Sequence, residues 1–305
     1  MFDLIILGGG PAAIGAGVYA ARKRMKTLLL TKEFGGQSVD SAMIENFIGH
    51  NSISGVEFAR VLEAQLRLQE DIEIKVGVTV EALEQQGDLW RVTDSKKNQY
   101  EARAVLVAIG SRYKRLNVPG EKQYEGKGVF FCSLCDAPLM KNKKAAVIGG
   151  GNAGLEAVVD LLPYATEIHL LVRGELKGDP IYQERIFKEE KVHVHRSVTV
   201  SRFAGSEFME KVYYSALGSD EEQFVEAQGA FVEIGQMPNT ELFEKTLTLS
   251  DSKHIVVDPR TMQTSAQGVW AAGDITDISY KQINTSIGDG IKAVLNIYET
   301  LQKNL

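Results

Sequence analysis

Apolar and small residues follow the same order twice along the chain. The run 4–7 is apolar, ends at a cluster of glycines and is followed by small residues. The run 144–148 is likewise followed by a glycine cluster and then by an apolar segment, 155–162. Both stretches predict a strand, a tight turn and a helix. Each series also ends on a mainly apolar run closed by glycine: 104–110 is continuously apolar, which is typical of a strand buried on both faces, and 230–235 mirrors it.

The periodicity between these runs predicts further elements. A second strand follows each helix, at 27–31 and 167–172. Apolar residues at helical spacing predict an amphipathic helix over 54–69, with Val56, Ala59, Leu62 and Leu66 on its inner face. Alternating segments predict an antiparallel meander at 72–76, 79–83, 89–93 and 99–102, and later strands at 192–194, 198–203 and 211–216 after a helix at 181–190.

The end of the chain predicts one more strand and helix. A strand and a glycine–aspartate turn at 268–275 are followed by a helix at 281–299. This segment is too short to form a domain alone, so we expect it to return to the first one. The repeat therefore predicts an α/β fold with two Rossmann-like dinucleotide-binding domains of the three-layer ββα type, the second inserted into the first. The predicted parts are 1–113, 114–238 and 239–305.

Composition and charge narrow the class of protein. The 305 residues are 44% hydrophobic and 24% charged, which is typical of a soluble globular protein. A formal charge of −6 supplies no basic field for nucleic acid or an anionic membrane. No apolar run reaches membrane-spanning length, and the N-terminal run reads as a strand rather than a signal peptide. Both cysteines are taken up by one motif, which favours a reducing cytoplasm.

The two glycine clusters predict dinucleotide sites. Gly8 permits a tight turn, Gly10 lets the backbone approach a pyrophosphate, and Ala13 lets the helix pack closely on the strand. The alternative is simple strand–helix packing. Glu33, just after the second strand, is a candidate for a ribose contact or a solvated loop residue. The second cluster fits Gly-x-Gly-x-x-Gly at 149–154.

The two cysteines of the chain, Cys132 and Cys135, stand in one motif that ends with Asp136. Two intervening residues let the sulfurs close a small disulfide, which predicts a redox pair. The alternatives are half of a zinc site and two buried core cysteines. Zinc requires four ligands and the five histidines show no paired ligand spacing nearby, so we expect no metal site.

These motifs, taken in order, resemble the low-molecular-weight thioredoxin reductase family over essentially the whole chain. The resemblance rests on Gly8-x-Gly10-Pro11-Ala12, Cys132-x-x-Cys135-Asp136, Gly149-x-Gly151-x-x-Gly154, and Ala272-Gly273-Asp274 followed by Lys281-Gln282-Ile283. It implies that the first domain binds FAD and that the inserted domain carries the nicotinamide site and the disulfide. The implied FAD residues are Gly8, Gly10, Pro11, Ala12, Ala13, Glu33, Gly36, Gln37, Asn46, Gly110, Gly273, Asp274, Lys281, Gln282 and Ile283. The implied nucleotide residues are Gly149, Gly151, Asn152, Gly154 and Arg173.

The resemblance also implies a role for each member of the redox motif. Cys135 would face the flavin, Cys132 would attack the disulfide of a partner, and Asp136 would donate and accept the proton. An Asp136 that is partly buried would have the raised pKa that suits this task. The alternative is that Asp136 only caps a helix.

One stretch departs from the family. Where the family carries a histidine and two arginines for the 2′-phosphate of NADPH, this chain reads Val172-Arg173-Gly174-Glu175. One arginine remains, and no acid stands at the strand end for the ribose of NADH. The donor is therefore left open between NADPH, NADH and a reduced ferredoxin or flavodoxin.

Three functions are compatible with these residues. The first is an FAD-dependent enzyme that reduces thioredoxin or a similar small redox protein, as a homodimer by resemblance. The second is an FAD-dependent oxidase of a small dithiol. The third is a nucleotide-sensing module that retains flavin as a structural element, which requires idle cysteines. The placement of Asp136 beside the pair favours the first.

Overall fold

A computed structural model describes residues 1–41 and 43–303. The chain forms two compact units. Unit 1 consists of Met1–Arg112 and Met237–Leu305, and unit 2 of Tyr113–Gln236. The predicted inserted segment, 114–238, begins one residue later and ends two residues later than unit 2. The two connecting segments, β7 (Ser111–Tyr113) and β16 (Gln236–Pro238), pair in a two-stranded sheet.

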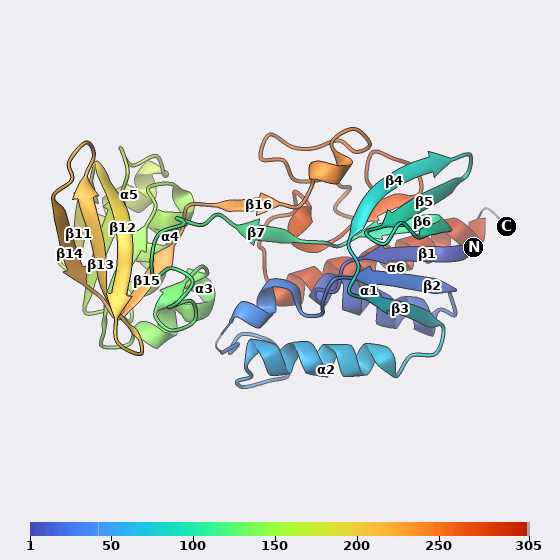
Figure 1. Cartoon of the computed structure of the whole chain (residues 1–305), viewed down its shortest axis with the longest axis horizontal. Coiled ribbons are helices and arrows are strands. Elements are labelled where there is room, and N and C mark those ends of the chain that lie inside the picture. The colour runs from blue at the N-terminus through green and yellow to red at the C-terminus, as the bar shows by residue number, and fades with distance from the viewer. Residues whose placement is uncertain (42, 304–305) are drawn as a thin grey trace. The chain divides into compact units, whose positions relative to one another are not determined.

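Unit 1 is built on a seven-stranded sheet with the order β3-β2-β1-β6-β5-β4, in which β17 also pairs with β6 (Figure 1). Strands β3, β2, β1, β6 and β17 are parallel, whereas β4, β5 and β6 pair antiparallel. The parallel centre is fully buried and apolar, as the sequence predicts. The strands are β1 (Phe2–Leu7), β2 (Thr27–Thr31), β3 (Ile72–Val76), β4 (Val80–Gln86), β5 (Leu89–Asp94), β6 (Gln99–Val107) and β17 (Val269–Ala271).

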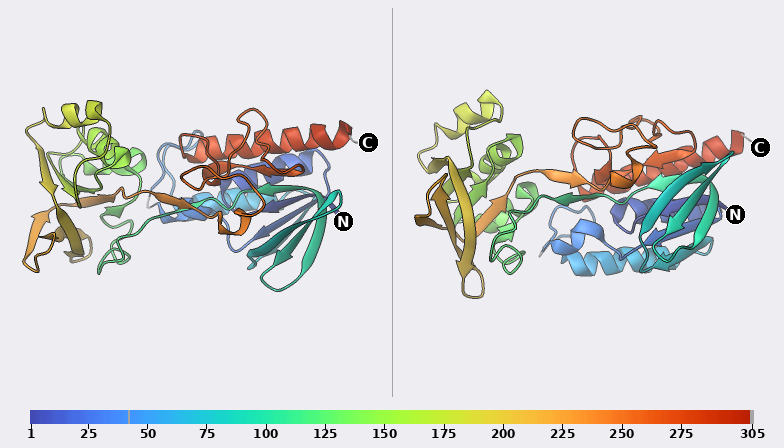
Figure 2. Two further views of the ribbon diagram at one scale, coloured as in Figure 1. Left: turned by 90° about the horizontal axis from the view of Figure 1, so that it is seen from above. Right: turned by 45° about the horizontal axis from the view of Figure 1, so that its top comes forward.

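Three helices complete unit 1: α1 (Pro11–Arg22), α2 (Gly55–Arg67) and α6 (Ile283–Lys303). Helix α6 lies along α1 (Figure 2). A Cβ atom at Gly290 would overlap the carbonyl of Ala12, and one at Gly15 would contact Ile287 tightly, so the small residues of both helices allow this close packing. The apolar face of α6 joins the same core as β1 and β2, which places the end of the chain in unit 1.

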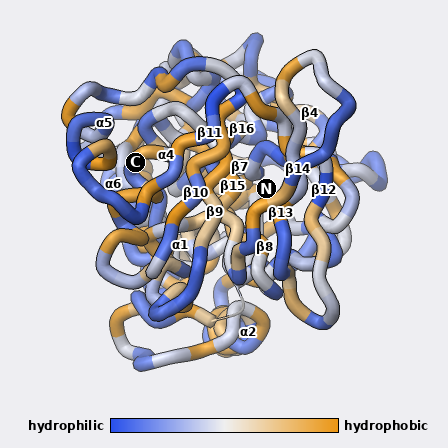
Figure 3. The backbone as a smooth tube through the Cα atoms, turned by 90° about the vertical axis from the view of Figure 1, so that its left-hand side faces the viewer, coloured by the Kyte–Doolittle hydropathy of each residue, from blue (hydrophilic) through white to orange (hydrophobic). Residues whose placement is uncertain are grey.

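Unit 2 has three layers. Its parallel sheet has the order β11-β10-β9-β15-β8, and a separate antiparallel sheet has the order β12-β13-β14. Alternate residues of β9 point to opposite faces: Ala146 and Ile148 join the core under the antiparallel sheet, and Ala145 and Val147 join the core under α4. The two β layers and one helical layer make the ββα arrangement that the sequence predicts. Figure 3 colours the backbone by hydropathy and shows apolar residues along the central strands β9 and β10, whose inner residues are buried.

The elements of unit 2 are short. Its strands are β8 (Val129–Phe130), β9 (Lys144–Ile148), β10 (Glu167–Val172), β11 (Val192–Arg196), β12 (Val198–Gly205), β13 (Met209–Ala216), β14 (Glu222–Glu226) and β15 (Gly229–Val232). Its helices are α3 (Ser133–Asp136), α4 (Asn152–Leu161) and α5 (Pro180–Ile186).

The described residues of both units also include the 3₁₀ turns η1 (Gly36–Asp40), η2 (Ala137–Met140), η3 (Glu241–Phe243) and η4 (Gly273–Ile275). Among the described residues, no helix has the length and apolar content of a membrane span.

The predicted four-stranded meander is wrong in two respects. Strand β3 is not part of it, because it follows α2 and pairs parallel with β2. The predicted strands at 99–102 and 104–110 are one continuous strand, β6, whose first half pairs with β5 and whose second half pairs with β1 and β17. Both errors concern pairing partners, which alternation within a segment does not specify.

The predicted inner face of α2 is wrong at one position. Val56 is 51% exposed, whereas Phe58 is fully buried beside Phe47. At about 100° per residue, Val56 lies roughly 90° from the centre of the stripe that Ala59, Leu62 and Leu66 define. Phe58 lies closer to that stripe on its other side, and its larger ring fills the core.

The observed orientation of α2 predicts that truncating Phe58 and truncating Val56 reduce the stability of unit 1 by unequal amounts. Phe58→Ala removes a fully buried ring and should destabilise unit 1 by about 3–5 kcal/mol. Val56→Ala, on the exposed side, should change stability by no more than about 0.5 kcal/mol. Chemical denaturation followed by circular dichroism measures both. Equal shifts of the two denaturation midpoints would contradict the observed orientation of α2.

Candidate functional site

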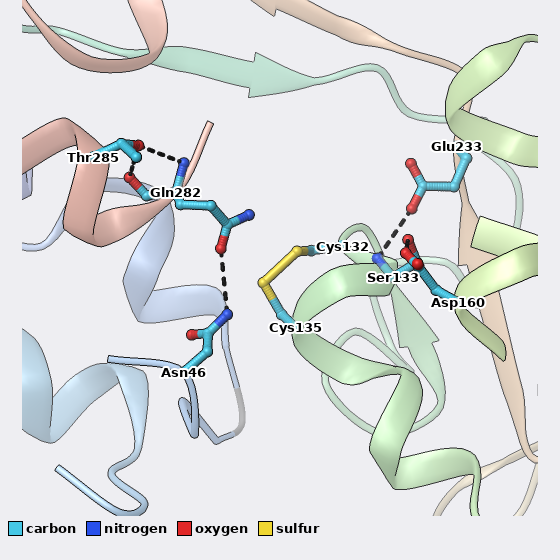
Figure 4. Close-up of a disulfide and its surroundings, with 8 residues drawn as sticks. All are labelled: Asn46, Cys132, Ser133, Cys135, Asp160, Glu233, Gln282 and Thr285. Carbon is cyan, nitrogen blue, oxygen red and sulfur yellow. Dashed lines mark hydrogen bonds between the residues drawn. A yellow bond between two sulfur atoms is a disulfide. The ribbon is translucent and has the colours of Figure 1, made fainter. Parts of the chain in front are cut away.

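Cys132 and Cys135 form a disulfide in unit 2 (Figure 4). The structure places Cys132 at the N-cap of the short helix α3 and Cys135 within that helix, with 5.4 Å between their Cα atoms. This Cα separation is ordinary for a disulfide. Leu134, between the two cysteines, is 60% exposed. The pair therefore stands at the surface of unit 2 rather than in its core.

Asp136 is buried directly after the second cysteine, with 7% of its surface exposed. Burial raises the pKa of its carboxyl to about 7. Asp136 ends α3 and precedes η2, and its side chain makes no capping hydrogen bond to that turn. A carboxyl with a pKa near neutrality can give a proton to a leaving thiolate and take it back.

Ser133, the residue after Cys132, is held by two carboxyl groups (Figure 4). Its backbone N–H donates to Glu233 Oε1 at 3.2 Å, and its hydroxyl donates to Asp160 Oδ2 at 2.9 Å. Burial raises the pKa of Glu233 to about 8. Sequence reasoning missed these residues, although one signal was present. Glu233 is the only charged residue in the apolar run 230–235.

The first glycine turn joins β1 to α1 in unit 1. Gly8 has a φ of +122°, and a side chain there would overlap the carbonyl of Ala108. Gly10 is different, since a Cβ atom there would find only Gly36 Cα, at 4.0 Å. Ala13 is fully buried against the core. Gly10 also stands at the N-cap of α1 without a side-chain cap, so free N–H groups face an open approach.

The other residues predicted to hold FAD all lie in unit 1. Gln37 is the most informative, because its Nε2 donates to Ser111 O at 2.7 Å while its buried Oε1 has no hydrogen-bond partner. Asn46 and Gln282, far apart in the sequence, are joined by a 3.3 Å hydrogen bond (Figure 4). An unpartnered buried acceptor beside an uncapped helix start fits a bound polar cofactor.

The structure places the remaining members of this set as follows. Pro11 and Ala12 open α1, and Ile283 opens α6. Gly36, Gly110 and Gly273 have φ values of +55°, +63° and +77°. Asp274 is half-buried and accepts a hydrogen bond from Ser286, and Lys281 donates to the carbonyl of Thr276. The side chain of Glu33 is exposed while its backbone carbonyl accepts a hydrogen bond from Thr31. This position is compatible with both a ribose contact and a solvated loop residue.

The second glycine turn, in unit 2, has the same arrangement as the first one in unit 1. A side chain at Gly149 would overlap the carbonyl of Glu233, and one at Gly154 would overlap the carbonyl of Gly149. Gly151 is open, with nothing within 4 Å of a Cβ atom, and it is the uncapped N-cap of α4. The three glycines thus serve the turn, the open approach and the close packing. The residues of both turns fit a pyrophosphate at a helix start.

The loop after β10 folds back over the second glycine turn. The N–H groups of Lys177 and Gly178 both donate to the carbonyl of Gly150, at 2.7 and 3.1 Å. Asn152, the first residue of α4, exchanges two hydrogen bonds with Asp179, at 2.7 and 3.2 Å. The predicted nucleotide residue Asn152 therefore also fastens this loop to the helix.

Two charged residues of this region pair with each other. Arg196, at the end of β11, lies in register with Val172 and contacts Glu175 at 3.3 Å. Arg173 follows β10 and is exposed. Sequence reasoning missed Arg196, because its position depends on the pairing of β11 with β10.

Among residues 1–41 and 43–303, no group of three His, Cys, Asp or Glu side chains is placed to hold a metal ion.

Comparisons with known proteins agree with this geometry. The family model described as pyridine nucleotide-disulphide oxidoreductase matches residues 2–290. A thioredoxin reductase from Streptococcus pyogenes superimposes with a TM-score of 0.93 at 29% identity, covering 99% of both chains. A thioredoxin reductase from Giardia duodenalis gives a TM-score of 0.92 at 25% identity, again over 99% of both chains.

Curated relatives include longer proteins. A component of alkyl hydroperoxide reductase from Pseudomonas aeruginosa is 38% identical over 304 residues, which is 98% of this chain and 58% of that protein. The corresponding component from Staphylococcus aureus is 36% identical over 99% of this chain and 60% of its own length. The chain thus spans less than two thirds of these relatives. With its disulfide and two glycine turns, the chain belongs to the pyridine nucleotide-disulphide oxidoreductase family.

Proposed function

We propose that this reductase passes electrons from a reduced nicotinamide nucleotide, through FAD and the Cys132–Cys135 disulfide, to thioredoxin or a similar small redox protein. The observation that carries the proposal is the disulfide beside a buried carboxyl of near-neutral pKa, in a unit that also holds an open glycine turn. A structural disulfide needs neither of these neighbours.

The chain's own residues supply the thiol chemistry. Once the pair is reduced, the Cys132 thiolate attacks the partner's disulfide, forming a mixed disulfide and releasing one partner thiolate. Cys135 then attacks Cys132, which restores the Cys132–Cys135 bond and releases the partner as a dithiol. Asp136, with a pKa raised to about 7 by burial, holds the proton that the departing thiolate takes up. These roles follow the resemblance, and they are supported by the half-buried position of both cysteines beside the exposed Leu134.

Unit 1 supplies the residues that would hold FAD. Gly10 and the uncapped start of α1 would bind the pyrophosphate, and the free Oε1 of Gln37 would accept a hydrogen bond. Bound FAD supplies two-electron transfer between the nicotinamide and the disulfide. In unit 2, Gly149, Gly151 and Gly154 would form the cradle of the nicotinamide nucleotide, with Arg173 beside its ribose.

The acceptor is proposed to be a thioredoxin-like protein. The names of the similar structures support thioredoxin, and the name of the curated relatives supports a partner that feeds electrons into peroxide reduction. Both require the same exchange at Cys132. We further propose a cytoplasmic homodimer that binds neither nucleic acid nor membrane, as the charge of −6 and the resemblance suggest.

Replacing each cysteine tests the proposal and the two roles together. Cys132→Ser and Cys135→Ser should both abolish reduction of oxidised thioredoxin, because each leaves one thiol. Only Cys132→Ser keeps the thiol assigned to the flavin, so only this variant should show added absorption at long wavelength. Steady-state assays and anaerobic visible spectra measure these effects. Full activity of either variant would reject the proposed function, and the absorption in the other variant would reverse the roles.

Matched glycine substitutions separate the two dinucleotide sites. Gly10→Val should strip the flavin, since a side chain there would block the pyrophosphate, whereas its Cβ atom would lie 4.0 Å from Gly36 Cα and so not clash with it. Gly151→Val, in equally open surroundings, should leave about one FAD per chain and weaken nicotinamide nucleotide binding. Flavin absorbance and nucleotide titration report the outcome. Normal flavin content in the Gly10 variant would show that the first site is misassigned.

The donor site predicts weak discrimination between NADH and NADPH. One exposed arginine contributes at most about 1.5–3 kcal/mol to a charged contact, an upper limit of roughly ten- to a hundredfold in affinity. Glu175, although paired with Arg196, opposes a phosphate nearby. Arg173→Gln should therefore remove whatever preference for NADPH exists and leave the rate with NADH unchanged. Stopped-flow reduction of the flavin measures both rates. Fast, strongly NADPH-selective reduction would contradict this reading, and reduction by neither nucleotide would point to ferredoxin or flavodoxin.

A further inference from the structure

Glu233 occupies a position where the internal repeat of the chain is chemically unequal. Its backbone carbonyl lies against Gly149, as the carbonyl of Ala108 lies against Gly8. The two residues are thus counterparts at the ends of the closing apolar runs. In unit 1 this position carries a methyl group, whereas in unit 2 it carries a carboxyl that contacts the redox motif. Neither the turn nor the strand requires a carboxyl, because Ala108 serves the same turn.

The contact of Glu233 with the redox motif is a single hydrogen bond. Its Oε1 accepts from the backbone N–H of Ser133 at 3.2 Å, one residue after Cys132. In Figure 4 the carboxyl lies on the Ser133 side of α3, whereas the two sulfurs point away from it. The carboxyl of Glu233 is thus connected to Cys132 through the backbone of Ser133, and it does not point toward the sulfurs.

The groups that face Glu233 carry the same sign of charge. Asp160 and Glu156 approach from α4 and Asp136 from α3, and all three disfavour its ionised form. Burial is the largest cause that raises the pKa of Glu233, to about 8, and the Ser133 N–H opposes it. Glu156 is engaged elsewhere, since it hydrogen-bonds Tyr182. The Glu233 carboxyl is thus mostly neutral at pH 7 and becomes charged as the pH rises through its pKa.

We propose that Glu233 is a positioning residue whose charge state sets the reactivity of Cys132 through Ser133. In its neutral form the carboxyl anchors the Ser133 N–H without adding charge. In its ionised form it places a negative charge one residue from Cys132 and disfavours the thiolate there. The inference rests on the assignment of Cys132 as the attacking thiol in the proposed function.

The test measures the pH dependence of Cys132 alkylation in the flavin-containing Cys135→Ser protein, where Cys132 is the single thiol. Glu233→Gln keeps an oxygen that can accept from Ser133 and removes the titrating charge. We expect this change to move the midpoint of the iodoacetamide rate profile by up to about one pH unit toward lower pH, a gain of about threefold in rate near pH 8. Superimposable profiles with and without the change would overturn the proposal.

Two control variants separate this effect from general charge and from loss of structure. Glu156→Gln removes a neighbouring carboxylate that does not bind Ser133, and Ser133→Ala removes the bond to Asp160 but keeps the N–H. Both should move the midpoint much less than Glu233→Gln, and an equal shift in either would overturn the proposal.

If the Glu233→Gln variant loses its flavin, the same alkylation profile is measured for Glu233→Asp. A carboxylate drawn back by one methylene from Ser133 should shift the midpoint in the same direction by a smaller amount, and no shift would overturn the proposal. Alkylation does not require electron transfer. Failure of the reductase function would appear separately, as wild-type protein that leaves oxidised thioredoxin unreduced.

Discussion

The structure depends on one steric constraint that occurs twice. Where the first strand of each unit turns into its helix, the backbone passes so close to the end of a neighbouring strand that no side chain fits: Gly8 lies against Ala108, and Gly149 against Glu233. This approach brings the helix start to the carboxyl end of the central strands. The next glycine but one, Gly10 or Gly151, is then left open at an uncapped helix start. Both cofactor cradles follow from this geometry.

The chemistry of the chain comes from what unit 2 adds to the shared plan. In unit 2 the short helix α3, with Cys132 at its N-cap and Cys135 within it, precedes β9, the counterpart of β1. The residue that corresponds to Ala108 is Glu233, which carries a carboxyl group. Ser133 joins these additions, since it binds Glu233 at the strand end and Asp160 in the helix after the glycine turn. The redox motif is therefore held by the strand end and the helix that flank the second glycine turn.

Local patterns predicted most of this fold and the main parts of the site. The apolar runs, the glycine spacing and the cysteine motif each depend on residues close together in the sequence. One error concerns a distant pairing, since β3 joins β2 rather than the meander, and another concerns the phase of a helix, since Phe58 rather than Val56 meets the core. Arg196 and the bonds of Ser133 were missed because each joins residues at least 20 positions apart. Glu233 left a readable signal, a charge within an apolar run.

The claim that Cys132 and Cys135 exchange electrons with a bound flavin is tested most directly by counting electrons. Anaerobic titration with dithionite, followed by flavin absorbance and thiol content, gives the number of electrons that each chain accepts. Since the disulfide and the flavin each take two, the wild-type protein should accept about four, and the Cys135→Ser variant about two. A wild-type protein that accepts only about two, with its disulfide intact after the flavin is reduced, would contradict this account.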